Sequence, residues 1–391
     1  MNTRVTIAAA AAMLLAVACP LAPSRAQDAY VIGLTGALTG PAAGTQAPTI
    51  EGLRLYIERL NGQGGVNGHK ITLLIQDDQG EPSKAAANGT KLLTQDNVVL
   101  LVESSLSSTY APVVAEAKRA GVPILFAGAV CPKEVFPPAD ALQFCTTGYG
   151  PGYDSRMALG FIKDNAQGAV KIGFAAMAIP LSRGEIDYAE GQAASLGMTA
   201  VDKEVIPPPT PDYTPFATKL AGAGPDWVFS WAPWVTEVKT FESLRRLGWS
   251  GRYLAYSHLE AEGELPRVKD GGFYVFGANA LFQDNLPVQG EIRDAAQKAG
   301  IAYPAQQLSE GWIAGMALEA GLKRAGWPTT PAALAAALAH IDVDTKGLRG
   351  GPIVWTGENH FRTRQYYRVY RWDPDKQAIA RVRDWTGFDV K

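Results

Sequence analysis

The stretch "YVIGLTGALTGPAAGTQAPTIEGLRLYIERLNGQGGVNGHKITLLIQDDQ", Tyr30 to Gln79, decides the fold. An apolar run typical of a buried strand leads into a loop of Gly, Thr and Ala. An amphipathic helix, a Gly-rich turn and a second apolar strand follow. This order predicts a βαβ unit whose first loop is lined by glycines. Such a loop could hold a nucleotide, a reacting substrate or a solute that is only carried.

The same alternation runs through most of the chain. Apolar runs such as "VVLLVES" and "VPILFAGA" alternate with helical patterns, and continuous apolar runs are typical of strands buried on both faces. The pattern restarts near residue 150 with a second unit of similar size, and "QYYRVYRWD" reads as a late strand. We therefore predict an α/β protein built from doubly wound parallel sheets.

Composition and motifs exclude several classes of protein. The 391 residues are 47% hydrophobic and carry a formal net charge of only -2, so nucleic acid is not an expected partner. The glycines of the first loop, Gly33, Gly36 and Gly40, lack the G-x-G-x-x-G spacing, and no Gly-Lys-Ser/Thr follows. No HExxH, GxSxG or CxxC occurs. We expect no cofactor, no metal site and no enzymatic activity.

The N-terminus predicts export. Residues 1–26 combine Arg4, an apolar segment and the small-x-small ending "SRA", which together are typical of a cleaved signal peptide. Cys19 could alternatively be lipidated, because "AVAC" faintly resembles a lipobox. Cleavage after Ala26 leaves Cys131 and Cys145, an even pair in an oxidising compartment. A disulfide between them is the favoured interpretation, and two buried free thiols are the alternative.

Several polar and aromatic residues follow predicted strands. In "ESSLSSTYAPVV", Ser107, Ser108 or Thr109 can cap a helix whose free N–H groups would attract an anion. Asp77 and Asp78 could be a metal or acid pair, but residues there more often bind loop backbone. In "DWVFSWAPWVTEV" we expect Trp227 in the core, and at least one of Trp231 and Trp234 in a cleft. His69 and His360 lie in turns, where we expect them to face solvent.

Together these segments resemble the periplasmic solute-binding proteins of ABC importers, specifically the leucine/isoleucine/valine-binding (type I) branch. The resemblance covers essentially all of the mature chain and rests on the stretch quoted above with "GVPILFAG", "PDYTPFATKLAGAGPDWVF" and "ESLRRLGW". It implies a periplasmic protein with two α/β lobes, joined by three crossovers, that close on a small molecule and deliver it to ABC permease subunits in the inner membrane. The lobes would be residues 28–147 plus 277–366 and residues 148–276 plus 367–391.

The resemblance also implies ligand-binding positions. The hydroxyl anchor after the third strand matches Ser107, beside Ser108, and the backbone-carbonyl position after the fourth strand matches Gly128. In the second lobe, the aromatic or small residue of the first loop falls near Leu181 to Arg183, and the aromatic of the next loop falls on Pro233 or Trp234. We separately predict that Arg183, from the loop "PLSRGE", adds a second clamp on closure, with a solvated surface arginine as the alternative. Two positions depart from the family. Its threonine falls on Val130, and the acid that binds a ligand ammonium falls on Ser257 or His258.

These departures favour a ligand with a carboxylate but no α-ammonium, such as an aromatic or aliphatic acid, because an unmatched buried ammonium is costly. If the true acid is Glu260 or Glu262, a branched-chain or other hydrophobic amino acid is the alternative ligand. Two other classes remain open at this point. A secreted hydrolase is disfavoured by the missing nucleophile–base motifs, and a receptor module feeding a membrane sensor would have the same sequence pattern.

Overall fold

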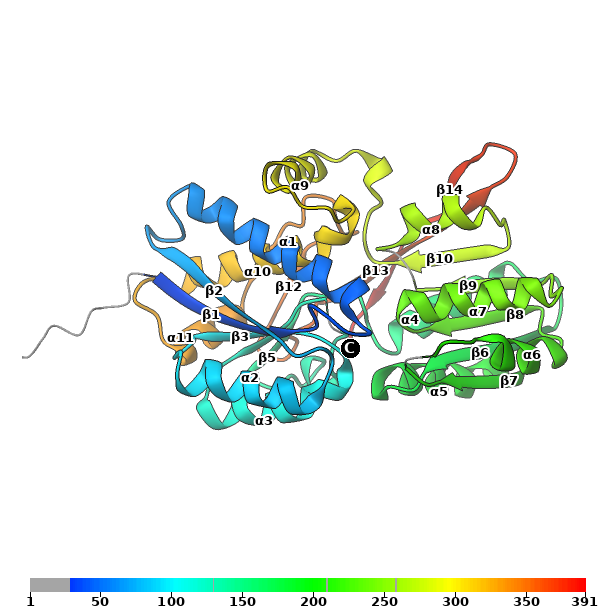
Figure 1. Ribbon diagram of the computed structural model, residues 1–391, viewed down its shortest axis with the longest axis horizontal. Coiled ribbons are helices and arrows are strands. Elements are labelled where there is room, and N and C mark those ends of the chain that lie inside the picture. The colour runs from blue at the N-terminus through cyan, green and yellow to red at the C-terminus, as the bar shows by residue number, and fades with distance from the viewer. Residues whose placement is uncertain (1–28, 129, 209, 257–258) are drawn as a thin grey trace, which may run out of the picture.

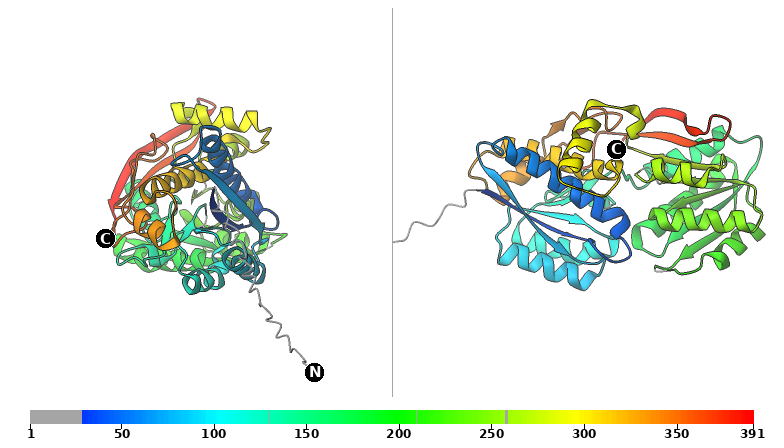
Figure 2. Two further views of the ribbon diagram at one scale, coloured as in Figure 1. Left: turned by 90° about the vertical axis from the view of Figure 1, so that its left-hand side faces the viewer. Right: turned by 45° about the horizontal axis from the view of Figure 1, so that its top comes forward.

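The computed structural model describes residues 29–128, 130–208, 210–256 and 259–391, which form two lobes side by side along the long axis (Figures 1 and 2). The expected signal peptide lies outside the described residues. In the described part of the chain, no helix is long and apolar enough to cross a membrane.

Lobe 1 is built on a parallel sheet with strand order β2-β1-β3-β4-β5. The strands are β1 (Ala29–Gly36), β2 (Lys70–Asp77), β3 (Leu100–Ser104), β4 (Ile124–Phe126) and β5 (Gln143–Cys145). Its helices are α1 (Ala43–Gly62), α2 (Pro82–Thr94), α3 (Tyr110–Ala120), α9 (Pro287–Lys298), α10 (Ser309–Ala325) and α11 (Pro331–Leu338). A small ladder of β11 (Asp342–Val343) and β12 (Ile353–Val354) completes it.

Helices cover both faces of this sheet because the side chains of its strands alternate (Figure 1). On β1, Tyr30 and Ile32 pack with α1 and α10, whereas Val31 packs with α2 and α3 on the other face. Leu100 and Leu101 of β3 divide between the faces in the same way. The continuous apolar runs are thus strands that are buried on both faces.

Lobe 2 repeats the topology. Its sheet has the order β14-β13-β10-β9-β8-β6-β7, and the parallel part, read as β7-β6-β8-β9-β10, matches the order of lobe 1. These strands are β6 (Val170–Met177), β7 (Met198–Ile206), β8 (Trp227–Trp231), β9 (Arg252–Ala255) and β10 (Phe273–Gly277). Helices α4 (Tyr153–Asp164) and α5 (Pro180–Ala193) pack on one face. The other face carries α6 (Thr214–Gly222), α7 (Trp234–Arg246) and α8 (Ala261–Val268).

An antiparallel hairpin of β13 (Arg364–Asp373) and β14 (Ala378–Asp389) extends this second sheet beside β10. The late strand expected at "QYYRVYRWD" is therefore confirmed, whereas β14 had no counterpart among the predicted elements. The chain passes between the sheets three times, after β5, after β10 and before β13. Two lobes joined by three crossovers are confirmed, and the lobe boundaries given above stay a proposal.

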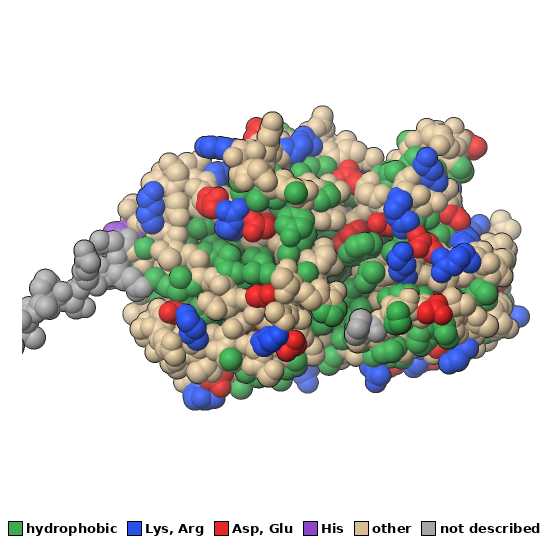
Figure 3. All heavy atoms as spheres, viewed as in Figure 1, with side chains coloured by type: hydrophobic (Ala, Val, Ile, Leu, Met, Phe, Trp, Pro, Cys, Tyr) green, Lys and Arg blue, Asp and Glu red, His purple; other side chains and the backbone are tan. Residues whose placement is uncertain are grey.

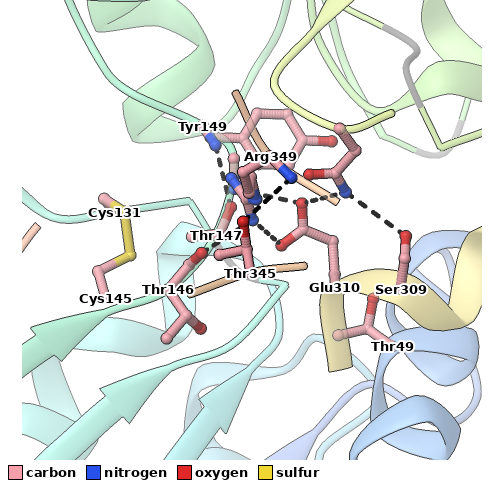
Figure 4. Close-up of polar contacts among 12 residues, drawn as sticks. Thr49, Cys131, Cys145, Thr146, Thr147, Tyr149, Ser309, Glu310, Thr345 and Arg349 are labelled. Atoms are coloured by element: carbon pink, nitrogen blue, oxygen red, sulfur yellow. Dashed lines mark hydrogen bonds and ion pairs between the residues drawn. A yellow bond between two sulfur atoms is a disulfide. The ribbon is translucent and has the colours of Figure 1, made fainter. Parts of the chain in front are cut away.

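A disulfide joins Cys131 to Cys145, as expected from the even pair (Figure 4). It ties the loop after β4 to the end of β5, and both cysteines are fully buried. This loop begins with residues that line the cleft between the lobes, so the crosslink supports the site described next.

Candidate functional site

The topology of each lobe predicts where a ligand binds. In a sheet of strand order 2-1-3-4-5, the first and third strands are neighbours, and the connections that follow them run to opposite faces of the sheet. A crevice opens between these two connections, beyond the carboxyl ends of the two strands. In lobe 1 this switch point lies between β1 and β3, and in lobe 2 between β6 and β8. The loops that follow these strands meet across the interlobe cleft. Figure 3 shows hydrophobic side chains along the seam between the lobes.

A cavity lies where the two switch points meet. It leaves about 50 Å³ to the centres of water molecules, and its whole unfilled space, mouth included, is about 530 Å³. Lobe 1 contributes Ala42, Thr45, Gln46, Ser105, Leu106, Ser107, Gly128 and Val130, and lobe 2 contributes Ile179, Ser182, Trp231, Ala232 and Pro233. Tyr149 comes from the first crossover.

The loop after β4 is fixed at three points. Gly128 has φ +73°, and a Cβ there would lie 2.4 Å from Cγ2 of Thr49 on α1, so only glycine fits. The hydroxyl of Tyr110 donates to the carbonyl oxygen of Val130 at 2.7 Å. The disulfide holds Cys131. Gly128 and Val130 therefore form a rigid part of the cavity wall.

Ser107 opens a helical segment, Ser107–Thr109, that continues into α3. Its Oγ accepts the N–H of Leu181 from lobe 2 at 3.4 Å, so its own proton stays available to donate. The expected helix cap is not formed. Thr109 instead donates to Glu103 Oε1 at 2.5 Å. The backbone N–H groups of Ser107 and Ser108 make no hydrogen bond with another described residue. Ser107 therefore offers donors to a ligand.

The wall from lobe 2 is aromatic and is held by buried hydrogen bonds. The indole Nε1 of Trp231 donates to Asp154 Oδ2 at 2.8 Å, and Ser182 Oγ donates to the Trp231 carbonyl at 2.6 Å. Asp154 also accepts the N–H of Gly150 in the first crossover, at 3.0 Å. Burial, followed by the charge of Glu185, raises the pKa of Asp154. This network fixes the ring of Trp231 against the cavity.

No carboxylate of a described residue lines the cavity. Glu260 is buried, and its Oε1 has no hydrogen-bond partner among the described residues. Burial and, second, the charge of Glu237 raise its pKa to about 8, while a hydrogen bond from Thr45 lowers it. Glu262 has a structural role, since it accepts the N–H of Gln283 at 2.7 Å in the second crossover.

The predicted site residues are only partly brought together. Ser107, Gly128 and Val130 line the cavity, and Ser108 lies just outside it. Trp234 does not line the cavity, and its indole Nε1 would lie 3.6 Å from a Cβ at Gly44 of α1. Arg183 is exposed and does not line the cavity. Ser257 and His258 lie outside the described residues, so their roles stay predictions, as does that of Arg183.

Other sequence interpretations can be checked directly. The Asp77 carboxylate accepts the N–H groups of Leu38 and Gln79, each at 3.0 Å, and Asp78 accepts the hydroxyl of Ser105 at 2.6 Å. The interpretation that these aspartates bind loop groups is thus confirmed. The expectation of a solvent-facing His360 was wrong, because its ring is buried with Nδ1 2.9 Å from the Gln143 carbonyl. No group of metal-ligating side chains gathers within the described ranges.

Sequence reasoning did not identify several residues that line the cavity. Ala42, Thr45 and Gln46 come from the start of α1, Tyr149 from the first crossover, and Ile179 and Ser182 from the loop and first turn after β6. A signal existed for the start of α1 and for the segment after β6, because both follow strands that the sequence patterns had identified, at the end where ligands bind. Tyr149 follows β5, a strand that the sequence patterns had not identified.

Comparison with known proteins identifies the class. Residues 29–378 match the periplasmic binding protein family, so the chain belongs to this family. The chain is 24% identical over 346 residues to an amino acid binding protein of Pseudomonas aeruginosa, covering 88% of this chain and 90% of that protein. The family comprises substrate-binding transport proteins, and the expectation of a non-enzymatic role is confirmed.

Solved structures agree on the fold. A branched-chain amino acid ABC transporter protein from Thermus thermophilus with bound valine superposes with a TM-score of 0.80 at 16% identity, covering 92% of this chain and 97% of that one. A solute-binding protein of an ABC transporter from Rhodopseudomonas palustris, in complex with 3,4-dihydroxybenzoic acid, gives 0.79 at 17% identity, covering 93% and 98%. The resemblance to the leucine/isoleucine/valine-binding branch is confirmed.

Proposed function

We propose that this protein captures a small carboxylate-bearing solute, with an aromatic or aliphatic acid favoured, and delivers it to the permease of an ABC importer in the inner membrane. The observation that carries the proposal is the composition of the cavity wall. Hydroxyl and N–H donors gather at Ser107, apolar and aromatic groups face them, and no acidic side chain of a described residue lines the cavity.

The carboxylate would lie against Ser107, where a hydroxyl proton and the N–H groups at the start of a helical segment favour negative charge. Trp231 and Val130 would contact the body of the ligand, because both line the cavity and neither offers a group that needs a polar partner there. An α-ammonium would find no anion in this wall. Leaving it unmatched costs on the order of 1–3 kcal/mol, which is about tenfold or more in affinity.

A second candidate ligand is a hydrophobic α-amino acid. It is favoured by Glu260, a buried acid that has one oxygen without a partner among the described residues and a hydrogen bond from Thr45 of the cavity wall. An ammonium that reached Glu260 would keep this carboxylate ionised. The matched relative from Pseudomonas aeruginosa, named for amino acid binding, supports this candidate, and the neighbour with a dihydroxybenzoate supports the first.

A thermal-shift screen of aromatic acids, aliphatic acids and amino acids tests the proposal, because a ligand that binds the native protein raises its apparent stability. Ser107→Ala should then weaken the best acid about tenfold, and Glu260→Gln should leave its affinity within about twofold. A screen in which only amino acids respond, with binding lost in Glu260→Gln, would overturn the acid and establish the second candidate. The exposed Ser195→Ala is the matched control for Ser107→Ala.

A further inference from the structure

Two buried arginines lie where the three crossovers meet. Arg349 sits between β11 and β12, and Arg362 stands just before β13. Only 5% of Arg349 and 3% of Arg362 is exposed. Arginine is almost never this deeply buried without a paired charge, so the partners of each guanidinium have to be counted.

Arg349 is paired. Its Nη2 donates to Glu310 Oε2 at 2.8 Å and to the Thr146 carbonyl at 2.9 Å (Figure 4). Glu310, at the start of α10, also accepts the side-chain amide of Asn279 at 2.8 Å and the N–H of Gly148 at 3.2 Å. One carboxylate thus neutralises Arg349 and ties the first crossover to the second.

Arg362 has only neutral partners. Its Nη1 donates to Gln365 Oε1 at 2.7 Å, and its Nη2 donates to the carbonyl oxygens of Thr146, at 3.4 Å, and Thr147. Its guanidinium lies 4.1 Å over the ring of Phe361. Among the described residues, no carboxylate forms an ion pair with it. Burial and, second, the charge of Arg349 lower the pKa of Arg362 to about 9, so it stays charged at neutral pH.

Three N–H positions on these arginines are buried and lack a partner in the described structure: Nε and Nη1 of Arg349 and Nε of Arg362. Both arginines line a small cavity, together with Ala278, Gly351, Gln365 and Tyr366. The exposed Arg364 also lines it, but this arginine is paired with Asp389. The cavity leaves about 10 Å³ to the centre of a water molecule, which is the room of about one water-sized particle.

We propose that this cavity binds a single chloride ion between Arg349 and Arg362. Among the described residues, the two buried guanidinium groups are paired with one buried carboxylate, Glu310, so one positive charge has no counter-charge there. A buried charge of that kind destabilises the fold. The unpartnered atoms of the two arginines are all donors, so the ligand that fits between them is one that accepts hydrogen bonds. The cavity has room for a monatomic anion and not for a phosphate or a carboxylate.

The ion would stabilise the joint between the lobes, because Arg349 precedes β12 and Arg362 follows it on the third crossover, while both bind carbonyls of the first crossover. This role is independent of the ligand in the cleft. It predicts that the ligand-free protein is more stable in chloride than in a bulky anion at the same ionic strength.

Crystals of the ligand-free protein grown or soaked in bromide test the proposal by anomalous diffraction, with a peak expected between the two guanidinium groups. The midpoint temperature of unfolding should be about 2 °C higher in sodium chloride than in sodium gluconate when the chloride concentration is ten times its Kd, and this difference should saturate at higher concentrations. Arg362→Gln should remove the difference, and Arg119→Gln, at an exposed arginine, should keep it.

Absence of the bromide peak would overturn the proposal, because it would show that water fills the cavity. A peak without any chloride-dependent gain in stability would mean an adventitious ion only, and would also overturn it. If Arg362→Gln does not fold, the bromide peak and the chloride–gluconate difference of the unaltered protein decide.

Discussion

Removing the disulfide should destabilise the protein by an amount that its loop length sets. The perturbation is the double substitution Cys131→Ala and Cys145→Ala, because alanine adds no polar group at two fully buried positions. The bond closes a loop with a sequence separation of 14 residues. Crosslinking a loop of about 15 residues lowers the entropy of the unfolded chain by an amount worth about 3 kcal/mol.

The two lost sulfur atoms add a smaller packing penalty, so we expect the free energy of unfolding to fall by about 3–5 kcal/mol. Tyr110 still holds Val130, and Thr49 still packs on Gly128, so the folded cavity wall should survive. Ligand affinity should therefore change less than stability does.

Urea unfolding followed by tryptophan fluorescence measures the loss, and unfolding of the unaltered protein with and without reductant is the control. The reduced protein should lose a similar amount, because the crosslink acts mainly on the unfolded chain. Thiol titration of the unfolded, unreduced mature chain should find no free thiol. A loss below about 1 kcal/mol, or two titratable thiols, would refute the reasoning.

Three further predictions follow from single features. Because burial raises the folded-state pKa of Glu260 from 4.5 to about 8, the stability that this residue contributes falls as the pH rises from 4.5 to 8. The free energy of unfolding of Glu260→Gln, measured in urea titrations, should therefore rise relative to that of the unaltered protein by on the order of a few kcal/mol over this range. Equal pH profiles of the two proteins would contradict this. Gly128→Ala should lower the free energy of unfolding by about 1–3 kcal/mol and weaken ligand binding, because its Cβ would collide with Thr49. The control Gly160→Ala in α4, where no atom would lie within 4 Å of the new Cβ, should be neutral or stabilising. Equal unfolding midpoints for the two variants would refute the packing argument. Small-angle scattering should show a smaller radius of gyration with ligand than without, and an unchanged radius with a tight ligand would count against lobe closure.

The fold could be predicted because its signal is local. The quoted stretch contains α1 and β2 in full and all of β1 except Ala29, and the continuous apolar runs mark strands that helices cover on both faces. The disulfide could be predicted from the even number of cysteines that remain after signal cleavage and from the oxidising compartment. Strand β14 was missed because it is largely half-exposed or exposed and alternates irregularly, so it lacks the apolar pattern of the buried strands.

The site could be predicted only in part because it depends on long-range contacts. Ser107 and Gly128 come shortly after predicted strands, and the resemblance to the family identifies both as ligand-binding positions. Glu310 and Arg349 read as ordinary surface charges in their own segments, because each is paired with a residue 39 positions away along the chain. Glu260 was an alternative anchor for a ligand ammonium, but its burial could not be read from its own segment. His360 was misplaced for the same reason, because the backbone that buries it comes from residues 140–143.

The most direct test of the proposed ligand class compares 4-methylpentanoate with leucine by calorimetry, because the two molecules differ only in the α-ammonium group. 3-Phenylpropanoate and phenylalanine form a second such pair with an aromatic body. The cavity wall has donors at Ser107 and no acidic side chain among the described residues, so at least one acid should bind about tenfold or more tightly than its amino-acid partner. Tighter binding of leucine or phenylalanine in both pairs would contradict the account.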